Sequence, residues 1–84
     1  EIQNSMAVYP NPTSESCYVT FSVKQKQEVN IDFVNIQGQL MMSRTLNALG
    51  SEIQYFDLSS LNSGIYMVKV TSNNECAYKR VVIR

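Results

Sequence analysis

The 84-residue sequence contains no histidine and no tryptophan, and only two cysteines. Without histidine there is no imidazole to act as a general base or triad member, and two cysteines are too few for the usual zinc-ligand sets. The candidate carboxylates Asp32 and Asp57 stand among apolar strand residues, and the Asp-x-Asp-x-Asp spacing of a calcium loop is absent. We therefore expect no enzyme activity, no catalytic site, no metal and no cofactor.

Net charge and long apolar runs are also missing. Seven Lys and Arg balance seven Asp and Glu, which removes the long-range field that gathers nucleic acid or an anionic membrane. The apolar runs are only a few residues long, such as Val81-Val82-Ile83, against the roughly 20 residues that span a bilayer. A chain of this size has a thin core with little room for a deep cavity. Neither a nucleic-acid partner nor a small-molecule substrate is expected.

The sequence does contain a regular alternation of apolar and polar residues, the period that indicates strands with one buried face. The expected strands are 6–9, 17–24, 29–33, 39–46, 53–58, 66–71 and 76–84, separated by turns at 10–13, 24–28, 35–38, 47–51, 59–64 and 71–75. No segment carries a sustained helical period, so helix is limited to a single turn near 59–63. The pattern predicts an all-β fold, an antiparallel immunoglobulin-like β-sandwich of about seven short strands.

Prolines and glycines mark the sharpest turns of this sandwich. Pro10 and Pro12 lack amide donors and fix φ near −65°, so they suit a rigid turn at a sheet edge. Gly38 and Gly64 are expected where the backbone requires a positive φ. Asp57 is expected to accept backbone amides at the corner that follows it.

Two apolar residues near that corner are expected to point inward. Leu61 is the one apolar residue of the polar segment 59–64, and Tyr66 alternates with Val68 and Val70. The alternation makes Tyr66 a core residue rather than an exposed recognition aromatic.

The ends of the chain suggest how it is organised. Residues 1–5 are polar without an apolar period, which predicts the remnant of an interdomain linker, and residues 6–84 form the folded domain. The sequence starts with Glu1 and shows no basic-then-apolar leader, so a secretory signal is expected upstream in a longer precursor. The chain is interpreted as a C-terminal piece of a larger protein.

Four short segments, in this order and spacing, resemble the type A C-terminal sorting domains of the type IX (Por) secretion system, over Val8 to Arg84. They are Val8-Tyr9-Pro10-Asn11-Pro12-Thr13, Val29-x-Ile31 with Asn35-Ile36-Gln37-Gly38-Gln39, Asp57-Leu58-Ser59-Ser60-Leu61-x-x-Gly64-Ile65-Tyr66, and Lys79-Arg80-Val81-Val82-Ile83. Each segment alone is weak evidence for this family, whereas all four in this order are specific to it. Asn35 stands where an Asp is common in the family, and either side chain can cap its own backbone in a turn.

The resemblance implies a secretion signal that targets a larger upstream cargo to the type IX outer-membrane translocon and its shuttle proteins. The domain would pass through the periplasm and reach the cell surface or medium, where a sortase-like surface protease would cut it off at or upstream of residues 1–6. The candidate recognition residues within the family motifs are Pro10, Asn11, Pro12, Thr13, Asn35, Gly38, Leu61, Gly64, Tyr66, Lys79, Arg80, Val81, Val82 and Arg84. For Pro10 to Pro12 a rigid edge turn and direct contact with the transporter are both open.

The last strand carries a local positive charge that the neutral total conceals. Lys79, Arg80 and Arg84 are three of the seven basic residues, and no acid follows Glu75. Such a strand is either an edge protected by charge or a surface that faces a receptor. In the second reading its edge backbone groups and cations are available for strand addition or for docking on an acidic groove.

Cys17 and Cys76 sit at the starts of the first long strand and the last strand. In an immunoglobulin-like sandwich these strands often lie side by side, and an oxidising periplasm permits a bridge. A disulfide between them and a pair of buried free thiols are both open.

Two other functions compete with the sorting signal. An adhesion or carbohydrate-binding β-sandwich would present exposed aromatics on a sheet face, and the absence of tryptophan counts against it. A structural spacer beside a catalytic domain has no sequence feature that separates it from the others.

Overall fold

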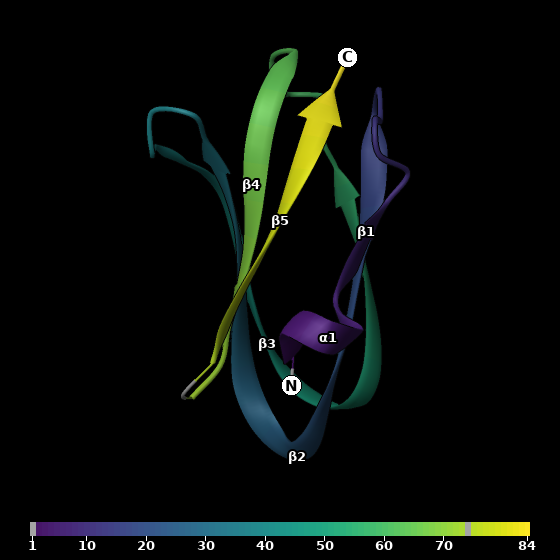
Figure 1. Cartoon of the computed structure of the whole chain (residues 1–84), viewed down its shortest axis with the longest axis vertical. Coiled ribbons are helices and arrows are strands. Elements are labelled where there is room, and N and C mark those ends of the chain that lie inside the picture. Colours follow the sequence, from purple (N-terminus) through teal and green to yellow (C-terminus); the bar gives the residue numbers. More distant parts are fainter. Residues whose placement is uncertain (1, 74) are drawn as a thin grey trace.

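The computed structural model describes residues 2–73 and 75–84, and within them the chain forms one short helix and five strands (Figure 1). The elements are α1 (Ile2–Ser5), β1 (Ala7–Tyr9), β2 (Ser16–Asn35), β3 (Leu40–Asp57), β4 (Gly64–Thr71) and β5 (Cys76–Ile83). The strands form one antiparallel sheet in the order β1-β2-β4-β5, and β3 pairs with β2. The all-β antiparallel class expected from the alternation is confirmed.

The two long strands make the sheet curl over on itself. The first half of β2 lies between β1 and the second half of β3, whereas its second half lies between β4 and the first half of β3. The register shifts between Val23 and Gln27, where β2 bends. As Figure 1 shows, both strands turn at the lower end and bring the two halves of the sheet face to face, as a half-barrel.

The expected seven-stranded sandwich is wrong, because two of its turns do not form among the described residues. The segments expected as turns at 24–28 and 47–51 lie inside β2 and β3. Within the second segment, Ala48 is fully buried inside the bend and Gly50 takes a φ of 74°. A small side chain and a positive φ let β3 follow the bend of β2 without leaving the ladder. Each pair of expected strands is therefore one bent strand, and no two separate sheets form.

The core lies inside the curl, on the face where the alternating apolar residues meet. Phe33 and Phe56 come from opposite halves of the sheet with ring centroids 4.9 Å apart. Leu61 packs against this core and Tyr66 is buried, as expected from the sequence. The Tyr66 hydroxyl donates a hydrogen bond to the Asn62 carbonyl at 2.7 Å, so the buried phenol keeps a partner.

Residues 2–5, expected as a linker remnant, pack on the domain as α1. Ile2 is only 2% exposed, and its amide donates to Oε1 of Glu75 at 3.0 Å. The Ser5 hydroxyl accepts a hydrogen bond from the Ser22 amide at 3.0 Å. The short helix is thus here rather than at 59–63, where the chain only turns. In the part of the chain that is described, no helix is long and apolar enough to cross a membrane.

Candidate recognition surface

Parts of all four motif segments, far apart in the sequence, meet at one end of the curled sheet, which we call the motif end. Thr13 forms a parallel bridge with Ile83, and Ile83 is the ladder partner of Gly64. Tyr66, two residues further along β4, pairs with Asn35. The motif end is the upper end in Figure 1, where β5 finishes and β4 begins.

The Pro-Asn-Pro-Thr segment covers the outer edge of the last strand. The Asn11 side chain donates from Nδ2 to the Arg80 carbonyl at 2.9 Å and accepts from the Val82 amide at 3.0 Å. The Thr13 amide donates to the Val82 carbonyl at 2.9 Å, and the Arg84 amide donates to the Thr13 carbonyl at 2.8 Å. The expectation of free edge backbone groups on the last strand is therefore wrong between Arg80 and Arg84, because Asn11 and Thr13 already occupy them.

Arg44 bridges the opposite open side of the curl, between the two halves of β3. Its guanidinium Nη1 donates to the Tyr55 carbonyl at 2.9 Å and to Oε1 of Gln54 at 3.2 Å. The same guanidinium lies 4.0 Å from the centroid of the Phe56 ring. A planar cation with several donors suits this position, since it stacks on an aromatic face and bonds in its own plane.

The turn after β2 is built by the side chain of Asn35. Its Oδ1 accepts hydrogen bonds from the amides of Gln37 and Gln39, each at 2.9 Å, and its carbonyl accepts from Gly38 at 3.0 Å. Gly38 has a φ of 84°, as expected for this position. Only the oxygen is needed as an acceptor, so Asn serves here as well as the Asp that is common in the family.

The corner before β4 is closed in a similar way. Oδ1 of Asp57 accepts a hydrogen bond from the Ser59 amide at 3.0 Å, as expected. This bond, together with the Ser59 side chain, holds the pKa of the Asp57 carboxyl below its ordinary value. Gly64 then starts β4 with a φ of 156°. Asp57 therefore shapes the backbone at the motif end, and its partner among the described residues is Ser59 rather than an acid or a base.

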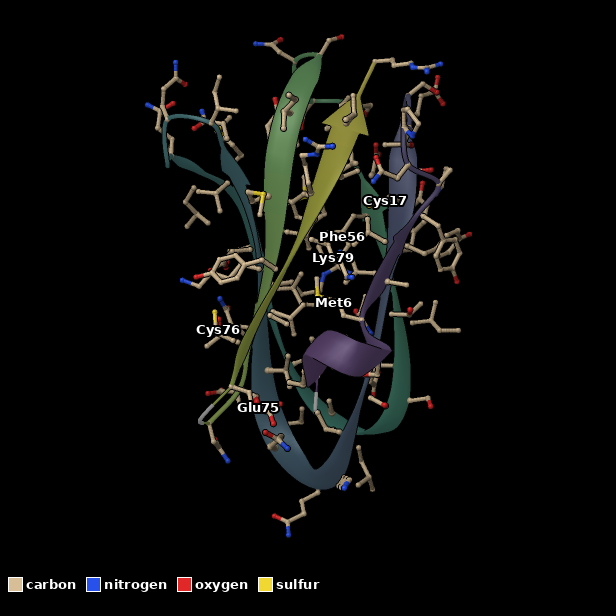
Figure 2. All side chains as sticks on the ribbon, in the orientation of Figure 1. Met6, Cys17, Phe56, Glu75, Cys76 and Lys79 are labelled. Carbon is tan, nitrogen blue, oxygen red and sulfur yellow. The ribbon has the colours of Figure 1, made fainter. Side chains whose placement is uncertain are left out.

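The three cations of the last strand do not form one row. Arg80 and Arg84 are exposed, whereas Lys79 is half-buried on the inner face between the buried Ala77 and Val81 (Figure 2). A strand alternates its faces, so Lys79 and Arg80 necessarily point in opposite directions. The local positive charge expected at the end of the chain is therefore presented to solvent by Arg80 and Arg84, whereas Lys79 faces inward.

Cys17 and Cys76 are both free thiols, so the disulfide considered from the sequence does not form. Cys17 is fully buried inside the curl, and its burial raises the pKa of the thiol to about 11. Cys76 is exposed on the outer face, with its sulfur 3.9 Å from the Thr71 hydroxyl (Figure 2). The segment between β1 and β2 contacts the last strand through the Thr13–Ile83 bridge, and the two sulfurs lie on opposite faces of the sheet.

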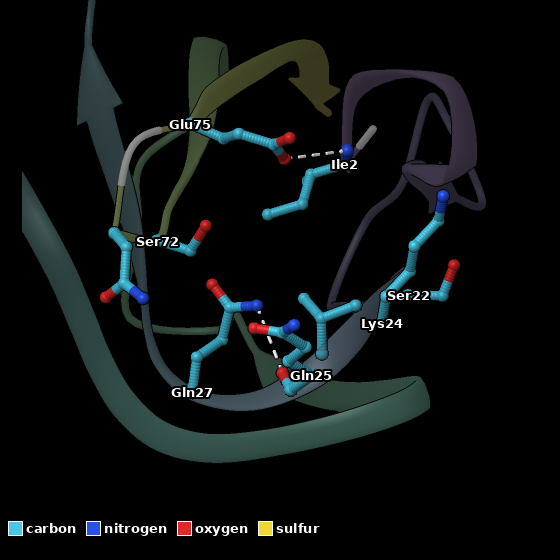
Figure 3. Close-up of a pocket in the computed structure, with 9 residues that line it drawn as sticks. Ile2, Ser22, Lys24, Gln25, Gln27, Ser72 and Glu75 are labelled. Atoms are coloured by element: carbon cyan, nitrogen blue, oxygen red, sulfur yellow. Dashed lines mark hydrogen bonds between the residues drawn. The ribbon is translucent and has the colours of Figure 1, made fainter.

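A polar cleft lies at the other end of the domain, beside α1 and the bend of β2 (Figure 3). Besides Ile2 and Val23, its lining is polar: Ser22, Lys24, Gln25, Gln27, Ser72, Asn73 and Glu75. The Gln27 amide donates to the Gln25 carbonyl at 3.1 Å, and the Glu75 carboxylate receives the Ile2 amide. Among the described residues no group of three His, Cys, Asp or Glu could hold a metal ion. This lining offers hydrogen bonds but no nucleophile paired with a base.

Sequence reasoning missed a ladder of exposed tyrosines on the outer face. Tyr9, Tyr18 and Tyr55 are neighbours across β1, β2 and β3. Their ring centroids are 5.7 Å apart for the first pair and 5.6 Å for the second. The alternation of Tyr18 with the buried Cys17 and Val19 indicated its outward direction, but only the pairing register brings the three rings together.

The chain resembles known proteins over nearly all of its length. A model of the family described as secretion system C-terminal sorting domain matches residues 7–84. Ulvan lyase NLR42 of Nonlabens ulvanivorans is 29% identical over 79 residues, which cover 94% of this chain and 14% of that protein. An endo-acting ulvan lyase of Formosa agariphila is 26% identical over 82 residues, 98% of this chain and 15% of that protein. The chain thus spans only about a seventh of the length of these relatives.

Proposed function

Because the chain belongs to the family of C-terminal sorting domains of the type IX secretion system, we propose that it carries a larger upstream cargo to the outer-membrane translocon and so to the cell surface or medium. The observation that carries this proposal is the family match over residues 7–84. The lengths of the two relatives support it, since each is several times longer than this chain and has room for a separate cargo. A catalytic domain of the kind that their names describe is a candidate cargo.

The geometry supports a function in binding rather than in chemistry. The motif residues of the described chain hold backbone edges and turns together, as Asn11 and Asn35 do, and none is paired as an acid or base. The two arginines of the last strand and several apolar side chains at the motif end face solvent. Surfaces of this kind recognise protein partners. Translocon and shuttle proteins are the partners that we propose.

Removal of the domain by a sortase-like surface protease belongs to the same proposal. Ile2 is buried and its amide is bonded to Glu75, so a protease that needs extended backbone cannot reach this segment while α1 is packed. The burial of Ile2 supports a cut upstream of it, in the connection to the cargo, and this is the position that we propose.

The test is a fusion of a leader, a fluorescent reporter and this domain, expressed in a bacterium with a type IX system. We expect the reporter on the surface or in the medium, and mass spectrometry should find it separated from an intact domain that still contains Ile2. A reporter that is exported with the domain attached contradicts the removal alone. A reporter that stays in the periplasm contradicts the sorting function.

The exposed tyrosine ladder is the feature on which a second candidate function, a carbohydrate-binding module, would depend. Sugars bind to aromatic faces that are open to solvent, whereas the rings of Tyr9 and Tyr18 stack on each other at an interplanar angle of 27°. We expect this mutual stacking to serve the sheet as a cross-strand contact. Retardation of the free domain in a polysaccharide affinity gel, lost in Tyr18→Ala, would favour the carbohydrate function instead.

A further inference from the structure

An exposed apolar patch lies on the outer face at the motif end; we call it the hairpin patch. Its exposed members are Ile36, Leu40, Met41 and Ile65, and its half-buried floor is Val34, Met67 and Val82. The ladders make it continuous, because Leu40 pairs with Val34, Val34 with Met67, and Ile65 with Val82. Three of the exposed members, Ile36, Met41 and Ile65, also line one shallow cleft together.

Three members of this patch belong to the motif segments, yet they do not build the core. Ile36 belongs to the Asn35 turn, Ile65 follows Gly64, and Val82 lies in the last strand. Their inward neighbours, such as Phe33 and Tyr66, fill the interior instead. Ile36 is 76% exposed and Leu40 is 61% exposed. Removing side chains this large from water favours association, so a contiguous exposed patch indicates a binding surface.

The charge beside the patch is positive. Arg80 is the ladder partner of Met67 and is exposed, and among residues 2–73 and 75–84 it has no ion-pair partner. Asp32 lies on the same outer face, but Lys69 is its partner in the β2–β4 ladder, so these two opposite charges sum to zero and leave Arg80 unbalanced. A second copy of the domain would bring the same positive rim to the interface and be repelled. An occupant with apolar side chains and carboxylates fits both features.

We propose that the hairpin patch is the surface by which the domain docks on a protein component of the secretion machinery, one that presents apolar side chains beside carboxylates. This inference rests on the proposed sorting function. It replaces strand addition at the end of β5, because Asn11 and Thr13 already cover that edge. Side chains of the patch insert into the partner, while Arg80 pairs with an acid at the rim.

The experiment compares two matched double variants in the reporter fusion. Ile36→Ser with Leu40→Ser alters the patch, and Leu49→Ser with Ile53→Ser alters side chains that are 61% and 65% exposed outside it. We expect the control to be exported like the parent and the patch variant to be exported at least about tenfold less, with melting temperatures within about 2 °C of each other. Export of the patch variant at the parental level overturns the proposal, and so does an equal loss in the control.

Three further variants distinguish the chemistry of the partner from a loss of fold. Leu40→Ile keeps the patch apolar and should keep export, whereas Arg80→Glu should reduce it and Arg80→Lys should not. The Arg80 side chain makes no hydrogen bond to the described residues, so Arg80→Glu keeps the test valid even if the serine variant melts early. Normal export of Arg80→Glu refutes the acidic partner. Failure of the parent itself to leave the periplasm refutes the sorting function rather than the docking surface.

Discussion

Asn11→Ala should destabilise the domain although Asn11 is exposed. The side chain makes two hydrogen bonds, to the Arg80 carbonyl and from the Val82 amide, and these residues are 69 and 71 positions away. A hydrogen bond contributes about 0.5–1.5 kcal/mol net, and because both bonds are exposed to solvent the expected loss lies in the lower part of the range for two bonds, at about 1–2 kcal/mol. For a domain of this size each kcal/mol lowers the melting temperature by about 4–8 °C, which predicts a fall of about 5–15 °C.

Thermal melts monitored by circular dichroism, with Asn62→Ala as the control, measure this loss. Asn62 is also exposed, and no described residue bonds to its side chain. Asn11→Asp should lie between the two, because a carboxylate still accepts from the Val82 amide but cannot donate to the Arg80 carbonyl. Amide exchange of Val82 should accelerate in the alanine variant. A melting temperature within about 2 °C of the parent, with Val82 as protected as before, would refute the closed edge.

The remaining predictions concern the other side of the curl, one turn and the thiols. Arg44→Met keeps the apolar stem but removes both hydrogen bonds, and should lower the free energy of unfolding by about 1–3 kcal/mol in urea titrations. Gly38→Ala should cost about 1–2 kcal/mol in the same assay, although nothing lies within 4 Å of the added Cβ, because φ is 84°. At neutral pH a thiol reagent should label Cys76 quickly and Cys17 only after unfolding, and fewer than two reactive thiols in denaturant without reductant would reveal a disulfide. Stability should be unaffected by the Cys17 thiol below pH 9 and should fall as the pH rises from 9 toward 11, because the unfolded thiol loses its proton first. A flat profile there would contradict the burial of Cys17.

The inward face of the sheet was predictable from the sequence because it depends on local alternation. Phe33 and Tyr66 are buried as the period of two requires, and Asn35 builds its turn with groups at most four residues away. The four motif segments also identified the family. These inferences need no knowledge of which strands pair.

Features that depend on pairing across the fold escaped the sequence analysis. Residues 24–28 are polar enough for a turn. They stay inside one bent strand because Val23 pairs with Gly50 and Gln27 pairs with Ala48 across the β2–β3 ladder. Asn11 cannot be assigned to the edge of β5 without the curl that brings the two ends of the sheet together. Lys79 was grouped with Arg80 and Arg84 by charge alone, although the alternation of faces along a strand turns it toward the buried side.

The most direct measurement of the central claim is the export of one fusion in two strains. A leader, a fluorescent reporter and residues 2–84 are expressed in a bacterium with an intact type IX system and in its translocon-deficient derivative, beside a reporter without the domain. The sorting function predicts surface or medium fluorescence only for the fusion in the intact strain, with periplasmic fluorescence in the other cases. Periplasmic fluorescence of the fusion in the intact strain, or equal export from both strains, would contradict it.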